Sequence, residues 1–202
     1  ISMTDWSPLD GESWVFAYRS WNDFANFIDL WSDRQLWQSI WRTLLIAAIC
    51  VPVEFMLGLG LALLFVDDFP GKRIFYPIVI TPMMVVPAIA GYMFFMLFQS
   101  AGPVNGLIGS LLGTDVQIAW LGDPTLALVS VMIADIWQWT PLMFLILLAG
   151  LVGVPDDQMK AANILGASWW YRFRTIVLPR MATVMIIALA IRIVEIIKIF
   201  DT

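Results

Sequence analysis

The sequence predicts an all-α fold, a polytopic bundle of transmembrane helices. Hydrophobic residues make up 60% of the 202 residues and charged residues only 13%, about half the charged share of a soluble domain. The apolar residues gather in four stretches, and each is long enough to cross a bilayer, which takes about 20 residues. Too few polar residues remain to cover a soluble core, so the chain is expected to reside in a membrane.

The four predicted spans cover residues 40–66, 74–98, 125–152 and 181–200. In the first span, Gly58 and Ala62 offer a small-residue face for close helix packing. Gly60 and Leu64 are expected to extend that face. In the second span, three prolines within residues 77–87 predict a bent or partly unwound helix, which membrane proteins tolerate where neighbours bond the freed carbonyls.

The basic residues predict the orientation of the spans. Segments 67–73 and 153–180 carry six Lys and Arg residues between them, whereas 99–124 carries none. Because cytoplasmic loops are enriched in Lys and Arg, the two basic segments are predicted to be cytoplasmic. Residues 99–124 are then outside, as a short re-entrant or interfacial segment.

Residues 1–38 are predicted to form an extracytoplasmic segment before a transmembrane domain that covers residues 39–202. This segment is rich in tryptophan: Trp6, Trp14, Trp21, Trp31 and Trp37, with Trp41 just after it. Indoles favour the lipid headgroup zone, and a small folded loop that buries them is an equal alternative. Neither end of the chain carries a tail or a signal peptide, so both ends are expected to be cut.

The polar segment 153–180 carries signals for two short helices. Residues 154–157 favour a helix start, since their carboxylates would lie near the positive end of the helix dipole. Gly166 can adopt the left-handed conformation that ends a helix, and Ser168 can cap a second helix. We therefore predict two helices joined by a glycine elbow, with Pro179 at the entry to the next span.

The side chains of this segment suit two different surroundings. Ala161, Ala162 and Ala167 keep one side slim, which suits a helix that inserts into a groove on another protein. The aromatic residues within 169–173 are interpreted as anchors in the inner headgroup layer.

Several kinds of chemistry are excluded by composition. The chain has no histidine and one cysteine, Cys50, so a metal site, a disulfide framework or a nucleophile–base pair is not expected. It has no GxxxxGK[ST] phosphate loop and no basic surface for nucleic acid. We expect no catalytic residue, no metal and no cofactor in this chain.

Charged residues within spans are costly in lipid and must face protein or water; here they are Glu54, Asp135, Arg192, Glu195 and Lys198. Asp135 lies beside Trp137, Gln138 and Trp139, and indole faces with carboxylate and amide groups suit a sugar. These four residues, with Glu54 and Arg192, could therefore line a substrate pathway. The alternative is that Asp135 or Glu54 pairs with Arg192 and joins helices. Arg192, Glu195 and Lys198 share one helix face, which we expect to pack inward.

Segment 153–180 resembles the "EAA" loop of permease subunits in binding-protein-dependent ABC importers. Lys160-Ala161-Ala162, Leu165-Gly166-Ala167 and Leu178-Pro179 stand at the positions of that motif with matching spacing. "DRQLWQSIWRTL", "GLGLALLF", "GPVNGLI", "WLGDPTLAL", "IWQWTPLMFLILLAGLVGVP" and "KIFDT" follow the order of the carbohydrate-uptake branch. Lys160 replaces the usual Glu and Leu165 the usual Asp, which puts the contact with an ATPase partner in question.

The resemblance implies a type I importer permease, with four of about six spans present and one more span at each end. It implies an inner-membrane protein of a bacterium or archaeon that translocates a carbohydrate, a polyol or a glycerol-phosphate solute. Its partners would be cytoplasmic ATPase subunits that hold ATP and Mg, a second permease subunit and an extracytoplasmic solute-binding protein. Residues 156–171 would couple the permease to the ATPase.

Two other functions are kept as alternatives. An ion-gradient-driven secondary transporter could use the buried carboxylates Glu54, Asp135 and Glu195, although the chain has no internal repeat and carries the coupling-type loop. A subunit that serves assembly but not transport is the other. The solute itself is not identified by the sequence.

Overall fold

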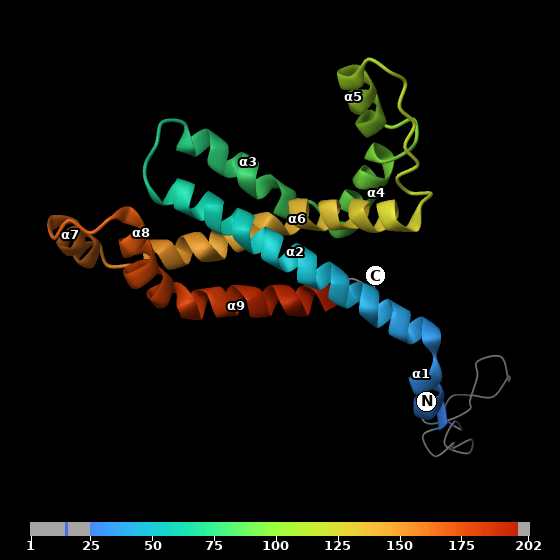
Figure 1. Cartoon of the computed structure of the whole chain (residues 1–202), viewed down its shortest axis with the longest axis horizontal. Helices are drawn as coiled ribbons and strands as arrows, with labels where there is room; N and C mark the ends of the chain where they lie inside the picture. Colours follow the sequence, from blue (N-terminus) through green and yellow to red (C-terminus); the bar gives the residue numbers. More distant parts are fainter. Residues whose placement is uncertain (1–14, 16–24, 198–202) are drawn as a thin grey trace. The chain divides into compact units, whose positions relative to one another are not determined.

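The computed structural model of the chain describes Val15 and residues 25–197, and it contains helices but no strand in these ranges (Figure 1). The helices are α1 (Ala25–Ser32), α2 (Arg34–Val66), α3 (Lys72–Met84), α4 (Pro87–Leu97), α5 (Pro103–Leu112), α6 (Pro124–Val152), α7 (Asp156–Ile164), α8 (Trp169–Arg172), the π-helix η3 (Phe173–Val177) and α9 (Leu178–Ile197). The predicted all-α class is confirmed.

Among the described residues, three helical segments are long and apolar enough to cross a membrane: α2, α6 and the run from Trp169 to Ile196. The bent pair α3 and α4 is a fourth if it counts as one span. These agree with the four predicted spans. The helix of the first span begins at Arg34, earlier than residue 40, and its 33 residues correspond to about 50 Å at 1.5 Å per residue.

The chain divides into two compact units, residues 1–45 and 46–202, which are described separately. In the first unit, the rings of Trp31 and Trp37 meet edge to face at a centroid distance of 5.2 Å. The indole N–H of Trp37 donates to the backbone carbonyl of Trp31 at 2.8 Å. Both rings, and that of Trp41, are exposed. Trp6, Trp14 and Trp21 lie outside the described residues.

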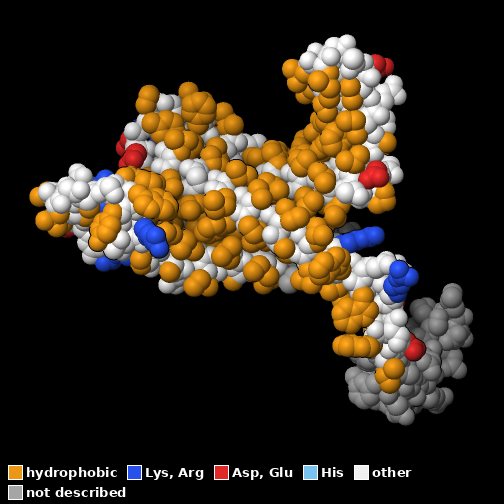
Figure 2. Space-filling model, in the orientation of Figure 1, with side chains coloured by type: hydrophobic (Ala, Val, Ile, Leu, Met, Phe, Trp, Pro, Cys, Tyr) orange, Lys and Arg blue, Asp and Glu red, His pale blue; other side chains and the backbone are white. Residues whose placement is uncertain are grey.

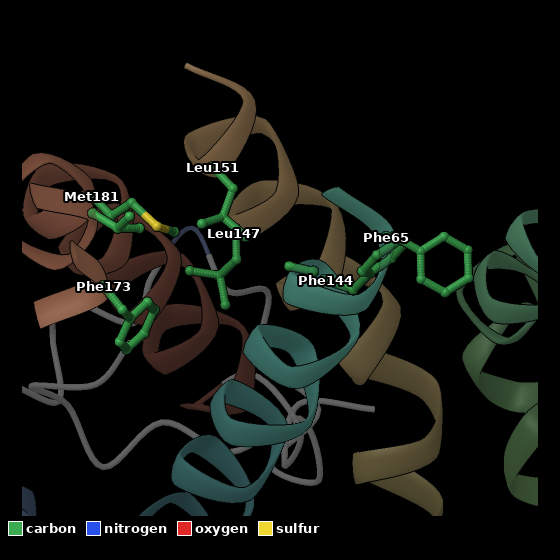
Figure 3. Close-up of a cluster of buried hydrophobic side chains, with 8 residues drawn as sticks. Phe65, Phe144, Leu147, Leu151, Phe173 and Met181 are labelled. Atoms are coloured by element: carbon green, nitrogen blue, oxygen red, sulfur yellow. The ribbon is translucent and has the colours of Figure 1, made fainter. Parts of the chain in front are cut away.

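Residues of α2, α6 and α9 form the core of the second unit. One apolar cluster joins Phe65 of α2, Phe144 and Leu147 of α6, and Phe173 and Met181 of the last helices (Figure 3). The rings of Phe65 and Phe144 meet edge to face at 5.2 Å. Outside this core, hydrophobic side chains cover much of the surface (Figure 2), as expected where lipid is the solvent.

The close approach of α2 and α6 depends on Gly58. A Cβ at this position would lie 2.7 Å from Met143 Cβ and 2.9 Å from the backbone nitrogen of Phe144. Ala62 is fully buried on the same side, so the predicted packing face is present at Gly58 and Ala62. Its predicted extension is wrong: a Cβ at Gly60 meets nothing within 4 Å, and Leu64 is exposed, because both point away from α6.

Gly58→Ala is expected to destabilise the protein by about 1–3 kcal/mol, since the added methyl group overpacks the α2–α6 contact. Gly60→Ala is the matched control and should leave the thermal unfolding midpoint unchanged. Thermal unfolding of both variants in the same detergent measures the difference. Equal midpoints for the two variants would contradict the close approach at Gly58.

The second span is bent by 98° between α3 and α4, which confirms the prediction from its prolines. Val85 and Val86 adopt extended backbone angles between the two helices, and Pro87 starts α4. A residue before proline is disfavoured in helical geometry, which accounts for Val86. The amide of Gln138 in α6 donates to the backbone carbonyl of Val85 at 3.0 Å, so the freed carbonyl is satisfied from a neighbouring helix.

The two basic connections lie at the same end of the second unit. Phe69, from the α2–α3 connection, packs against the same apolar cluster as Val154 and Met159. Helix α5 and the segment that follows it lie at the opposite end (Figure 1). This alternation agrees with the predicted topology, in which 67–73 and 153–180 share one side and 99–124 the other.

Candidate functional site

Helix α7 is a short, polar, exposed helix between two long apolar ones. On one side of α7, the Met159 side chain packs against the apolar core of the bundle. Lys160 and Ala161 are exposed, and Ala162 is half-buried. The predicted loop residues therefore lie on the surface, at the end of the bundle and held to it on one side.

The predicted glycine elbow is confirmed. Gly166 has φ +77°, a left-handed conformation that is costly for residues with a Cβ. The backbone N–H of Ala167 donates to the carbonyl of Ala162, and that of Gly166 to Asn163, both at 3.0 Å. These two bonds form a Schellman motif, which ends α7 and satisfies its last carbonyls.

The second short helix begins as predicted but continues into the last span. The Ser168 hydroxyl oxygen accepts from the backbone N–H of Tyr171 at 3.3 Å and caps α8. Trp169 and Phe173 stack with their ring planes only 3° apart at 5.3 Å. Both Trp169 and Trp170 are more than half exposed, which suits the predicted headgroup anchors; their contact with lipid stays a prediction.

Pro179 lies at the entry to the last span, as predicted, and a π-helical turn joins that span to α8. In η3, the backbone N–H of Leu178 bonds to the carbonyl of Phe173, five residues earlier. Pro179 has no N–H, and its ring would clash with the carbonyl four residues before it. The wider turn accommodates the proline while the helix continues, so 178 and 179 belong to the start of α9 rather than to a separate loop end.

Three of the charged residues within the spans, Glu54, Asp135 and Arg192, form a buried ion cluster that joins three helices. Lys198 lies outside the described residues. Arg192 of α9 donates from Nε to Glu54 Oε2 at 2.6 Å and from Nη2 to Glu54 Oε1 at 2.9 Å. The same Nη2 also donates to Asp135 Oδ2 of α6. Arg192 is 1% exposed and Glu54 fully buried. The structure therefore contains the carboxylate–Arg192 pairing that the sequence suggested as interhelical glue.

Four side chains of α6 were predicted to line a sugar site: Asp135, Trp137, Gln138 and Trp139. They point in three directions rather than toward one site. Trp139 lies beneath the guanidinium of Arg192, whose Cζ is 5.0 Å from the ring centroid, on the same side as Asp135. Gln138 bonds to the α3–α4 break, and Trp137 meets Phe94 of α4 edge to face at 5.4 Å. Successive residues of a helix are about 100° apart, which is why adjacency in sequence did not place them together.

Of these side chains, Trp137 borders a groove between α2, α3 and α6. Its volume is about 260 Å³, and its lining is apolar apart from Thr140: Leu57, Leu61, Ile78, Val79, Pro82, Ile136, Trp137, Thr140 and Pro141. Glu54, Asp135 and Arg192 do not line it. A solute with many hydroxyl groups finds few polar partners in this groove.

The family model for binding-protein-dependent transport system inner membrane components matches residues 54–202, well over half of the chain. The chain belongs to this family. It is a multi-pass inner-membrane protein, in agreement with the apolar spans of the described residues.

This permease is similar to two relatives of known name and to one solved structure. It is 32% identical over 202 residues to the trehalose/maltose transport system permease protein MalF of Thermococcus litoralis, covering 96% of this chain and 68% of MalF. It is 35% identical over 177 residues to the trehalose transport system permease protein SugA of Mycobacterium tuberculosis, covering 88% of this chain and 56% of SugA. The chain thus spans about two thirds or less of these relatives.

A bacterial ABC transporter involved in the import of the acidic polysaccharide alginate has the same fold, with a TM-score of 0.80. The match covers 95% of this chain and 67% of the solved chain, at 20% sequence identity. It supports the arrangement of helices in the permease and carries no information on its solute.

A polar residue that the sequence analysis did not single out organises the far end of the permease. Asn105 of α5 is 3% exposed. Its amide nitrogen donates to the carbonyls of Ser100 and Ile118, and its oxygen accepts from the indole N–H of Trp120, all at 2.9 Å. The "GPVN" start of α5 was the available signal, because asparagine side chains commonly bond backbone groups around turns.

Asn105→Ala is expected to loosen residues 100–120, because it leaves the Trp120 N–H and two carbonyls without partners, at about 1–3 kcal/mol per buried group. Hydrogen–deuterium exchange of the purified protein should show faster exchange in this segment and no change in α6. Ser110→Ala is the control, since the Ser110 hydroxyl is exposed and bonds only within its own helix. Unchanged exchange at 100–120 in Asn105→Ala would show that Asn105 does not hold this segment.

Proposed function

We propose that this chain is the permease subunit of an ATP-driven ABC importer, which moves a carbohydrate or a related polyol or glycerol-phosphate solute across the cytoplasmic membrane. The observation that carries the proposal is the exposed helix α7, held between two spans in a chain of this permease family. MalF and SugA are named for disaccharide transport, which favours a carbohydrate solute here.

Residues 156–171 would seat in a cytoplasmic ATPase subunit, which would hold ATP and Mg. The contact residues proposed for coupling are Lys160, Ala161, Ala162, Leu165, Gly166 and Ala167, with Leu178 and Pro179 at the base of the last span. Helix α7 supports this role, because its Met159 side chain packs against the apolar core of the bundle while Lys160 and Ala161 are exposed. A second permease subunit and an extracytoplasmic solute-binding protein would complete the importer; a neighbouring solved alginate importer is described in complex with such a periplasmic protein.

Two of the residues proposed to line a solute pathway contact the α3–α4 bend. Trp137 and Gln138 are placed to respond to movement of the α3–α4 bend, since each contacts it. Asp135, Trp139, Glu54 and Arg192 are bound to one another within the bundle, which favours a structural role over direct contact with solute.

The alternative is an ion-gradient-driven transporter that would use Glu54, Asp135 and Glu195. Two of these carboxylates are bonded to Arg192, and a bonded pair exchanges ions less readily than a free carboxylate. We therefore prefer the ATP-driven importer.

Purification of the full-length subunit from its native membranes tests the proposal. We expect an ATPase and a second permease to co-purify, and ATP hydrolysis to rise when a sugar-loaded binding protein is added. A subunit that purifies alone and still transports solute would contradict it.

A further inference from the structure

The outer side of α7 has a defined composition. Met159 and Ala162 face the bundle, and at 100° per residue the opposite side is centred on Ala161 and Ile164. Ile164 and Leu165 are each 86% exposed. The small Ala161 and these two large apolar residues give α7 an apolar ridge beside Lys160.

Lipid does not account for this ridge. Helix α7 lies at the end of the bundle, beyond the α2–α3 connection rather than on the flank of the spans (Figure 1). Around the ridge, the helix is polar, with the sequence DDQMKAANI. Two large apolar side chains exposed on a polar helix at this position are typical of a surface that a protein partner covers.

Lys160 lies one turn before Ile164, and so on the same side of α7. Among the side chains that the structure describes, no carboxylate lies within ion-pair distance of Lys160; the described ion pairs involve Lys72 and Arg192 only. A cation next to an apolar ridge, without a partner from its own described surroundings, is complementary to a carboxylate at the rim of an apolar recess.

We propose that α7 seats in an ATPase socket whose floor is an apolar recess for Ile164 and Leu165 and whose rim carries a carboxylate that pairs with Lys160. The proposal rests on the proposed function and names the chemistry of its partner surface. Lys160 and Leu165 stand where the loop of this family usually has Glu and Asp. The ATPase socket would therefore differ at its contacts with these two residues. This permease then selects an ATPase with a matching socket.

Carbodiimide cross-linking of the native complex tests the ion pair, because this reagent joins a lysine amine to a carboxylate only when the two are in contact. We expect mass spectrometry to find Lys160 linked to an Asp or Glu of the co-purified ATPase. Lys160→Arg keeps the charge but lacks the reactive amine, so the ATPase should remain bound and the link should disappear. Lys72, which pairs with Asp68 at 3.0 Å, is the internal control for reagent activity.

Two substitutions test the apolar recess and the charge together. Leu165→Asp and Lys160→Glu restore the usual residue types of the loop, yet each should lower the amount of ATPase retained by about 10-fold or more. The first places an uncompensated carboxylate in an apolar recess, and the second sets like charges against each other. Asp115→Asn removes an exposed carboxylate from the segment after α5, at the opposite end of the bundle from α7, and should retain the ATPase fully.

The outcomes separate the two proposals. If the wild-type chain retains no ATPase, the proposed function fails. If it retains the ATPase but shows no link at Lys160, and Leu165→Asp and Lys160→Glu bind as well as wild type, the importer stands and the socket proposal is overturned.

Discussion

Replacement of Arg192 by methionine should destabilise the permease by about 3–5 kcal/mol, because it leaves Glu54 and Asp135 as buried charges without a cation. The guanidinium bonds Glu54 through two nitrogens and reaches Asp135 through one of them. It therefore joins α2, α6 and α9 at one point. We expect a large fall in the thermal unfolding midpoint in detergent or nanodiscs.

Two further variants show whether the effect comes from the unpaired charges. The triple variant Glu54→Met, Asp135→Leu, Arg192→Met should recover most of the lost stability, since apolar residues of similar size often replace a buried ion cluster without loss. Lys72→Met, which removes the exposed pair with Asp68, should leave the midpoint unchanged. If Arg192→Met unfolds at the wild-type temperature, the cluster does not hold the three helices.

The second large effect is expected at the elbow of α7. Gly166→Val places a β-branched residue at φ +77°, at a cost of about 1–2 kcal/mol, which corresponds to a fall of about 5- to 30-fold in the population of that conformation. The Schellman bonds to Ala162 and Asn163 should open and α7 should lose its orientation. We expect solute uptake to fall by a similar factor, while the amount of protein in the membrane stays the same.

Gly166→Asn separates backbone strain from loss of space. No atom lies within 4 Å of a Cβ at Gly166, and asparagine tolerates the left-handed conformation better than other residues with a Cβ. Its uptake should therefore stay close to wild type. Equal uptake by the Val and Asn variants would mean that the left-handed elbow is not required for transport.

Much of the fold could be predicted because lipid imposes simple rules. The lengths of the apolar stretches predicted four spans, and the basic loops predicted how these alternate across the membrane. The prolines of residues 77–87 predicted the bend. The loop signals were equally local: Gly166 and Ser168 stop and start helices through bonds to residues only a few positions away. Such features depend on neighbours in sequence, which the sequence displays directly.

The features that could not be predicted depend on which side of a helix faces which neighbour. Gly58 packs and Gly60 does not, although both lie in the same small-residue stretch. Trp137, Gln138 and Trp139 adjoin in sequence but contact different helices. The π-helical turn before Pro179 was not predicted either; its residue Phe173 packs in the core with Met181 of α9.

The most direct test of the account is solute uptake by proteoliposomes that contain the complete transporter and its binding protein. If this chain is an ATP-driven permease coupled through α7, uptake requires ATP inside the compartment that holds the ATPase, is insensitive to ionophores and falls in Gly166→Val. Uptake that proceeds without ATP and collapses when an ionophore removes the ion gradient would contradict the account and direct attention to the buried carboxylates.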